Sequence, residues 1–227
     1  MKITLTFILL ITFSTLGISQ ESDNFSFRAG IEVTAERIRS SKLNEKPTFW
    51  NYGLATEFQI KQNWIIHLNL SHSIRNYETK QSGLIFLSDI MNGTTSYYSS
   101  NVDEKLIEIE NYLKYQFLRK KLSPFVGFGY AIQFPYSVNG ERKIIHSDGT
   151  IENLSNPEDL ISKNNFGLYA NLGLNYEFVD RLILIFDFGH KWYFNSNLVV
   201  YGFPKLEESR NRHNSFILSL GLLYRLK

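Results

Sequence analysis

The sequence contains no cysteine, which excludes disulfide bonds, thiolate metal sites, cysteine nucleophiles and lipid attachment through an N-terminal cysteine. The formal net charge is only +2, so the chain shows no electrostatic signature of a nucleic-acid-binding protein. The hydrophobic fraction of 43% is too low for a bundle of membrane helices, and no sustained helical period follows residue 20. Four of the five histidines, His67, His72, His146 and His190, are scattered without metal-ligand spacing, and no metal and no cofactor is expected.

The first 19 residues differ from the rest of the chain. Lys2 is a short basic region, residues 3–16 form an apolar stretch, and Gly17 and Ser19 supply the small residues of a cleavage site. A membrane anchor needs about 20 apolar residues, and this stretch is shorter. The pattern therefore predicts a signal peptide at 1–19, an exported protein, and one mature domain at 20–227.

Aromatic residues make up 15% of the chain, and they favour pleated sheet. Large apolar residues alternate with small or polar ones in eight separate runs, most of them about ten residues long, which is the length a tilted strand needs to cross a bilayer. The sequence therefore predicts an all-β fold, an eight-stranded antiparallel up-and-down transmembrane β-barrel. The runs cover residues 25–34, 50–60, 64–71, 107–117, 126–134, 166–178, 182–192 and 215–226.

The connections between these runs alternate between short and long. Three are tight, at 61–63, 119–121 and 179–181, and four are long and polar, at 36–49, 78–103, 135–164 and 195–212. Short periplasmic turns and long extracellular loops are typical of outer-membrane barrels. Pro124 is expected to open one strand and Pro135 to follow its end, so that no proline interrupts the sheet.

Charge separates the two faces of the predicted strands. The face of large residues carries no acidic or basic residue, whereas the opposite face is rich in glycine and charge. A basic residue facing lipid costs roughly 2–4 kcal/mol at the bilayer midplane, so the charged face is expected to line the barrel interior. The interior of eight strands is just wide enough for side chains to fill it, which predicts a plugged lumen in which Arg28 pairs with Glu57. The expected lumen network comprises Arg28, Glu32, Glu57, Arg75, Glu108, Glu110, Lys114, Glu177, Asp187, Lys191 and Arg225.

Three segments carry a family resemblance: SPFVGFGY at 123–130, GLNYEF at 173–178 and GLLYRL at 221–226. They resemble the outer-membrane β-barrel domains common in Bacteroidetes, akin to the OmpA/OmpX-like eight-stranded barrels. The chain departs from many such proteins by ending in Lys227 rather than in an aromatic residue. The resemblance implies fold and location, and it implies no single activity.

Three functional hypotheses remain open. The main one is a monomeric, non-enzymatic protein in contact with outer-membrane lipid, which supports the membrane or presents its loops to an extracellular partner. The second is a narrow channel for ions or small hydrophobic molecules. The third is a lipid A-modifying hydrolase using His213 and Ser215, which share a strand face, with Glu207 or Glu208 as orienter. Lipid A deacylases use a His-x-Ser pair in which the Glu follows, and no carboxylate follows Ser215 here.

Overall fold

The computed structural model describes residues 26–39, 46–82, 97–118, 120–146, 148–154, 160–162, 164–194, 198–200 and 213–226. The expected signal peptide lies outside these residues. Within the described ranges every regular element is a β-strand, and no helix is long and apolar enough to cross a membrane. The strands are β1 Phe27–Arg39, β2 Thr48–Gln59, β3 Trp64–Ser82, β4 Tyr97–Gln116, β5 Leu122–Ile145, β6 Ile151–Leu154, β7 Leu160–Ser162, β8 Asn165–Val179, β9 Leu182–Tyr193, β10 Leu198–Val200 and β11 His213–Leu226.

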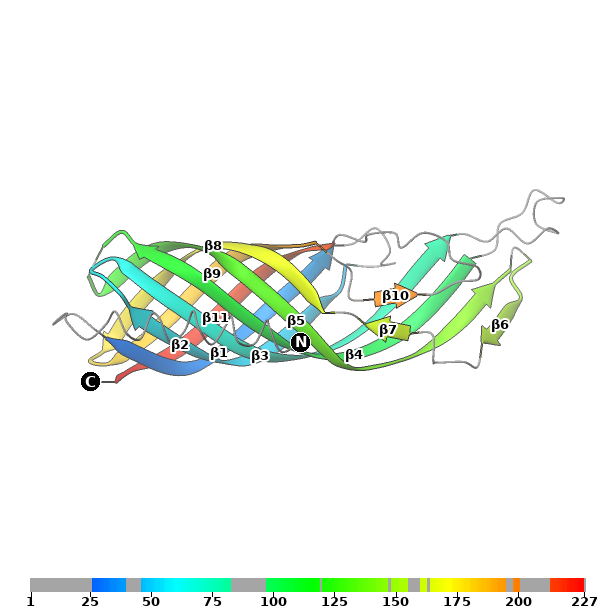
Figure 1. The fold of residues 1–227 in the computed structure, drawn as a ribbon, viewed down its shortest axis with the longest axis horizontal. Helices are drawn as coiled ribbons and strands as arrows, with labels where there is room; N and C mark the ends of the chain where they lie inside the picture. The colour runs from blue at the N-terminus through cyan, green and yellow to red at the C-terminus, as the bar shows by residue number, and fades with distance from the viewer. Residues whose placement is uncertain are drawn as a thin grey trace, which may run out of the picture.

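Eight of these strands close into a barrel (Figure 1). Neighbours pair antiparallel in the order β4-β3-β2-β1-β11-β9-β8-β5, and the pairing of β4 with β5 closes the ring. The predicted eight-stranded barrel is therefore confirmed. Following hydrogen-bonded partners once around the ring from Phe27 returns to β1 at Arg37, a shift of ten residues (37 − 27). Such a stagger goes with strands tilted roughly 35–45° from the barrel axis.

The two faces of the wall have opposite chemistry. Phe128 and Leu172 are each 60% exposed on the outside, whereas Glu57 is 1% exposed and Lys114 is fully buried inside. A continuous apolar exterior of this kind marks a surface that meets lipid or another apolar phase. The predicted sidedness is confirmed, because the apolar residues point out and the ionisable ones point in.

The barrel has a turn end and a loop end. The connections at 60–63, 117–121 and 180–181 and the C-terminal end of β11 all lie at the turn end, on the left of Figure 1. At the loop end, β3, β4 and β5 continue past the barrel as a sheet that β6 joins by pairing with β5 (Figure 1). We call this four-stranded part the projecting sheet. Beside it, the short strands β7 and β10 pair with each other.

The connections at the loop end are shorter than expected, because strands of the projecting sheet occupy part of them. Much of the connection expected at 78–103 is strand, because β3 runs to Ser82 and β4 begins at Tyr97. The connection expected at 135–164 likewise contains the end of β5 and all of β6 and β7, and that expected at 36–49 is shortened by β1 and β2. Apolar alternation weakens where a sheet leaves the membrane, while backbone pairing continues, so the sequence pattern stopped earlier than the strands.

Pro135 lies inside β5, and the expectation that it follows the strand end is wrong. The pairing of β4 with β5 slips by one residue here, since Leu106 faces Pro135 and Lys105 faces Ser137, which leaves Tyr136 as the extra residue of a bulge. On the other side of β5, pairing with β8 ends at Gln133. Proline is tolerated at such a bulge because the ladder is already interrupted there.

Two inward glycines test how tightly the wall is packed. A Cβ on Gly129 of β5 would lie 2.0 Å from the Asn111 carbonyl oxygen of β4, whereas the nearest atom to a Cβ on Gly221 of β11 is 3.5 Å away. We expect Gly129→Ala to destabilise the folded barrel by about 1–3 kcal/mol, through overpacking, and Gly221→Ala to cost less than about 1 kcal/mol. Urea titration in detergent micelles, read from the mobility of unboiled protein on a gel, measures both. Equal losses for the two variants would contradict this packing.

Candidate functional site

The barrel interior is filled by charged side chains rather than by water-accessible space. Among the described residues, seven carboxylates, two arginines, two lysines and one histidine are buried. An isolated buried charge costs several kcal/mol, so such an interior is stable only if the charges pair and form hydrogen bonds. The buried ionisable residues are Arg28, Glu32, Glu36, Glu57, His67, Arg75, Glu104, Glu108, Glu110, Lys114, Asp187 and Lys191.

A first cluster centres on Glu57 of β2. Arg28 Nη1 donates to its Oε2 at 2.9 Å, and Lys114 Nζ donates to its Oε1 at 2.5 Å. The expected pair of Arg28 and Glu57 is therefore present, because the two residues are register partners on β1 and β2. His67 lies between two carboxylates, with Nδ1 3.2 Å from Glu57 Oε1 and Nε2 3.3 Å from Glu32 Oε2.

A second cluster, nearer the loop end, centres on Lys191 of β9. Its Nζ donates to Glu108 and, at 2.5 Å, to Glu110 Oε1, both on β4 across the lumen. Glu108 Oε2 also accepts from the Gln133 amide at 2.5 Å and from the Tyr193 hydroxyl at 2.9 Å. The two inward glutamates of β4 are thus joined to one ammonium group, which gives them a structural role.

Glu36 links this cluster to Arg75 and to Ser215. Arg75 Nη2 donates to Glu36 Oε2 at 2.8 Å and lies 3.8 Å from Glu108 Oε2. The Ser215 hydroxyl, which is fully buried, donates to Glu36 Oε1 at 2.6 Å. A buried hydroxyl bonded to a lumen carboxylate does not reach the lipid phase, so this geometry gives Ser215 no access to a lipid substrate. The side chain of His213, and Glu207 and Glu208, lie outside the described part of the chain.

The turn end holds a half-exposed ion pair and a polar recess. Arg225 donates to both carboxylate oxygens of Glu177, at 3.0 and 2.8 Å, with both side chains about one-third exposed. This pair lines a recess of about 690 Å³ that also contacts Lys120 and Lys121. No residue of the Lys191 cluster lines the recess. Further inside, the buried apolar residues Ala55, Phe125, Ile183, Ile185 and Leu223 form a cluster of their own.

The structure brings nine of the eleven expected network residues into the buried interior and leaves Glu177 and Arg225 at the turn-end mouth. Asp187 accepts from the Tyr169 hydroxyl at 3.3 Å. Three buried ionisable residues are absent from the expected network: Glu36, which falls in an expected loop, Glu104, which falls between an expected loop and the next run, and His67, which shows no metal-ligand spacing. The signal for Glu36 was its parity, because it lies two residues beyond Thr34 on the inward face of the same strand.

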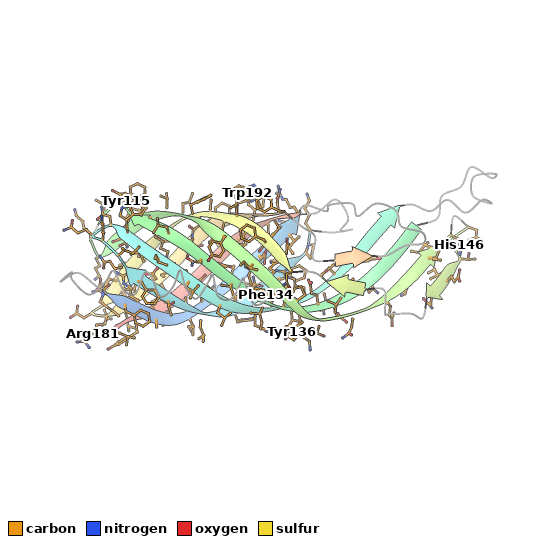
Figure 2. The ribbon with its side chains drawn as sticks, in the orientation of Figure 1. Tyr115, Phe134, Tyr136, His146, Arg181 and Trp192 are labelled. Atoms are coloured by element: carbon orange, nitrogen blue, oxygen red, sulfur yellow. The ribbon has the colours of Figure 1, made fainter. Side chains whose placement is uncertain are left out.

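The outer wall carries two rings of aromatic side chains. The ring at the turn end includes Phe58, Trp64, Tyr115 and Tyr224, and the ring toward the loop end includes Trp50, Phe166 and Trp192. Figure 2 labels Tyr115 and Arg181 at the turn end, Trp192 toward the loop end, and His146 at the tip of the projecting sheet. Such rings are typical of the two membrane–water interfaces of a barrel.

Metal binding needs several ligand side chains close together, and the described residues lack such a group. No group of three or more histidine, aspartate, glutamate or cysteine residues among them is arranged to hold a metal ion. The paired charges of the lumen network have the geometry of buried ion pairs that stabilise a fold only while both partners are present.

Removing the cation of the second cluster tests this assignment. We expect Lys191→Met to lower the free energy of unfolding by about 3–5 kcal/mol, because Glu108 and Glu110 stay buried with one cation fewer. Adding Glu110→Gln should recover part of the loss. Arg225→Met, which breaks a half-exposed pair, should cost no more than about 1 kcal/mol. Urea titration in detergent micelles compares the three proteins, and a Lys191→Met loss as small as that of Arg225→Met would refute a structural network.

Several solved structures are similar to this chain. The solved structures similar to this chain include the attachment invasion locus protein Ail of Yersinia pestis, with 10% identity, 88% of this chain and 99% of that chain covered, and a TM-score of 0.45. OprG from Pseudomonas aeruginosa has 13% identity, 89% and 95% coverage and a TM-score of 0.46. A major outer membrane protein from Thermus thermophilus has 13% identity, 89% and 100% coverage and a TM-score of 0.46.

No curated protein matches the sequence closely enough to count as a relative. The model of the outer membrane protein beta-barrel domain, in contrast, matches residues 5–222, which is nearly the whole chain. With the closed barrel, the inward charges and the apolar exterior already established, the chain belongs to the outer membrane protein beta-barrel domain family.

Proposed function

We propose that this protein is a non-enzymatic outer-membrane barrel that holds a rigid sheet outside the cell for contact with an extracellular partner. The membrane barrel serves as the anchor, with its turn end in the periplasm and its loop end outside. A monomer suffices for this role, since a closed ring of eight strands leaves no unpaired strand edge within the membrane.

The observation that carries the proposal is the length of three neighbouring strands. β3, β4 and β5 contain 19, 20 and 24 residues, whereas about 9–11 residues suffice to cross the bilayer. Beyond Ser73, the described strands pair with β3 only on its β4 side, so residues 74–82 form an edge of the described sheet. Exposed sheet edges bind extended peptides by adding a strand.

The interior argues against conduction. Lys114 and Lys191 are fully buried and bonded to carboxylates across the lumen, and Tyr112 and Tyr169 pack edge to face between them at a ring distance of 4.9 Å. An ion moving through would have to break these pairs at a cost of several kcal/mol each. The channel hypothesis is therefore disfavoured, as is a hydrolase that depends on the buried Ser215.

The plugged lumen predicts an absence of current. Purified wild-type protein in planar lipid bilayers is expected to show no discrete conductance steps, with a porin measured in the same chamber as the positive control. Reproducible single-channel steps from the folded protein would favour the narrow channel instead.

The natural absence of cysteine allows a direct test of orientation. Asn139→Cys places one thiol at an exposed position of the projecting sheet, and Asp180→Cys places one in an exposed turn at the other end. A membrane-impermeant maleimide should label Asn139→Cys in intact cells and Asp180→Cys only after the outer membrane is permeabilised. The reverse pattern would place the projecting sheet in the periplasm and remove the basis of the proposal.

A further inference from the structure

A group of basic side chains lies on the outward face of the barrel at its loop end. On β1 the inward positions hold Glu36 and Ile38, so Arg37 and Arg39 point outward, and both are exposed. Lys46, also exposed, lies next to them, because the Ile38 amide donates to the carbonyl oxygen of Pro47 at 3.1 Å across the hairpin. We call Arg37, Arg39 and Lys46 the rim patch.

The rim patch lies at the level of the aromatic ring toward the loop end. Arg37 is the register partner of Phe216, and Arg39 is the partner of Asn214, which in turn faces Trp192. On β11, Phe216 lies eight residues (224 − 216) from Tyr224, which belongs to the aromatic ring at the turn end. At about 3.4 Å per residue and a tilt of about 40°, this is roughly 20 Å along the barrel axis, close to the apolar band of about 25 Å in membrane barrels. The three cations therefore sit at headgroup height.

The described part of the chain supplies no anion for the two arginines. Neither arginine forms a salt bridge with any described residue. The described carboxylates of β1, β2 and β9 (Glu32, Glu36, Glu57 and Asp187) all point into the lumen, and β11 has none. Lys105 is the outward cation at the same end of β4. Unlike the two arginines it has a carboxylate nearby, because Asp103 is exposed two residues away on the same face.

One guanidinium is already oriented by an aromatic ring. Arg39 Cζ lies 4.5 Å from the centre of the Phe216 ring, and His190 packs against the same ring at a centroid distance of 4.5 Å. Stacking on a ring leaves the N–H edges of a guanidinium free, and these edges match a phosphate in a bidentate arrangement.

The wall below the rim patch matches the rest of a lipid. Ile31, Leu218 and Leu220, on β1 and β11, are 59%, 47% and 53% exposed. A lipid can place its acyl chains against this apolar wall and its phosphate groups against the rim patch above it. A soluble anion would contact only the rim patch.

We propose that Arg37, Arg39 and Lys46 bind the phosphate groups of a phosphorylated glycolipid in the outer leaflet. The inference rests on the proposed orientation of the barrel, but its test does not, because binding in a synthetic bilayer is independent of orientation in the cell. Failure of the cysteine-labelling experiment and failure of lipid binding are therefore distinguishable.

The test uses the full-length folded protein in phosphatidylcholine nanodiscs, titrated with bisphosphorylated lipid A or with the same lipid after removal of both phosphates. The wild type should bind the bisphosphorylated lipid at least tenfold more tightly than the dephosphorylated one, with affinity falling as salt rises. The double variant Arg37→Gln/Arg39→Gln should lose at least tenfold in affinity. Arg39→Lys keeps the positive charge but loses the bidentate N–H edge of the guanidinium, and it should lose less affinity than the double variant.

The matched control is Lys105→Gln, which removes one outward cation on the other side of the barrel and should change the affinity less than twofold. Unboiled gel mobility shows that each variant is folded. Unchanged binding by the double variant, or equal binding of the dephosphorylated lipid, would overturn the proposal. Complete displacement of the lipid by an equal concentration of inorganic phosphate would also overturn it, because the patch would then be a site for a free anion.

Discussion

Closure of the sheet by the pairing of β4 with β5 is the constraint on which the rest of the structure depends. A membrane interior provides no water to satisfy backbone N–H and C=O groups, so a sheet can cross it only as a ring without edges. A ring of eight strands leaves an interior that side chains alone can fill. The ionisable residues of the strands must then either face lipid or bond with one another inside, and the wall has only these two sides.

The inward charges meet this constraint by sharing partners across the lumen. Glu57 on β2 accepts hydrogen bonds from Arg28 on β1 and from Lys114 on β4. Lys191 on β9 donates to both Glu108 and Glu110 on β4. The contacts of Lys114 and Lys191 join strands that are not neighbours in the sheet. In the proposed function this barrel is the anchor, and the three strands that extend beyond the bilayer are the structure that it holds.

Much of this architecture could be predicted from the sequence, because period-two alternation with all the charge on one side has a single solution in a membrane. Arg28 and Glu57 could be paired in advance since they lie near one turn end on adjacent strands. The projecting sheet could not be predicted. Beyond the membrane no apolar phase distinguishes the faces, so β3, β4 and β5 lose their alternation while their backbones stay paired. Glu104 of β4 could not be assigned to the lumen for the same reason, and the bulge that admits Pro135 within β5 leaves no mark in the sequence.

By itself the sequence determined the number of barrel strands, their antiparallel order and which face of each meets lipid, since these follow from local patterning of apolar and charged residues. Only the tertiary structure decided which charges meet. Lys191 lies 83 residues from Glu108, and Ser215 lies 179 residues from Glu36. These pairs depend on the ten-residue stagger of the ring, and a stagger is a property of the closed sheet that no single strand encodes.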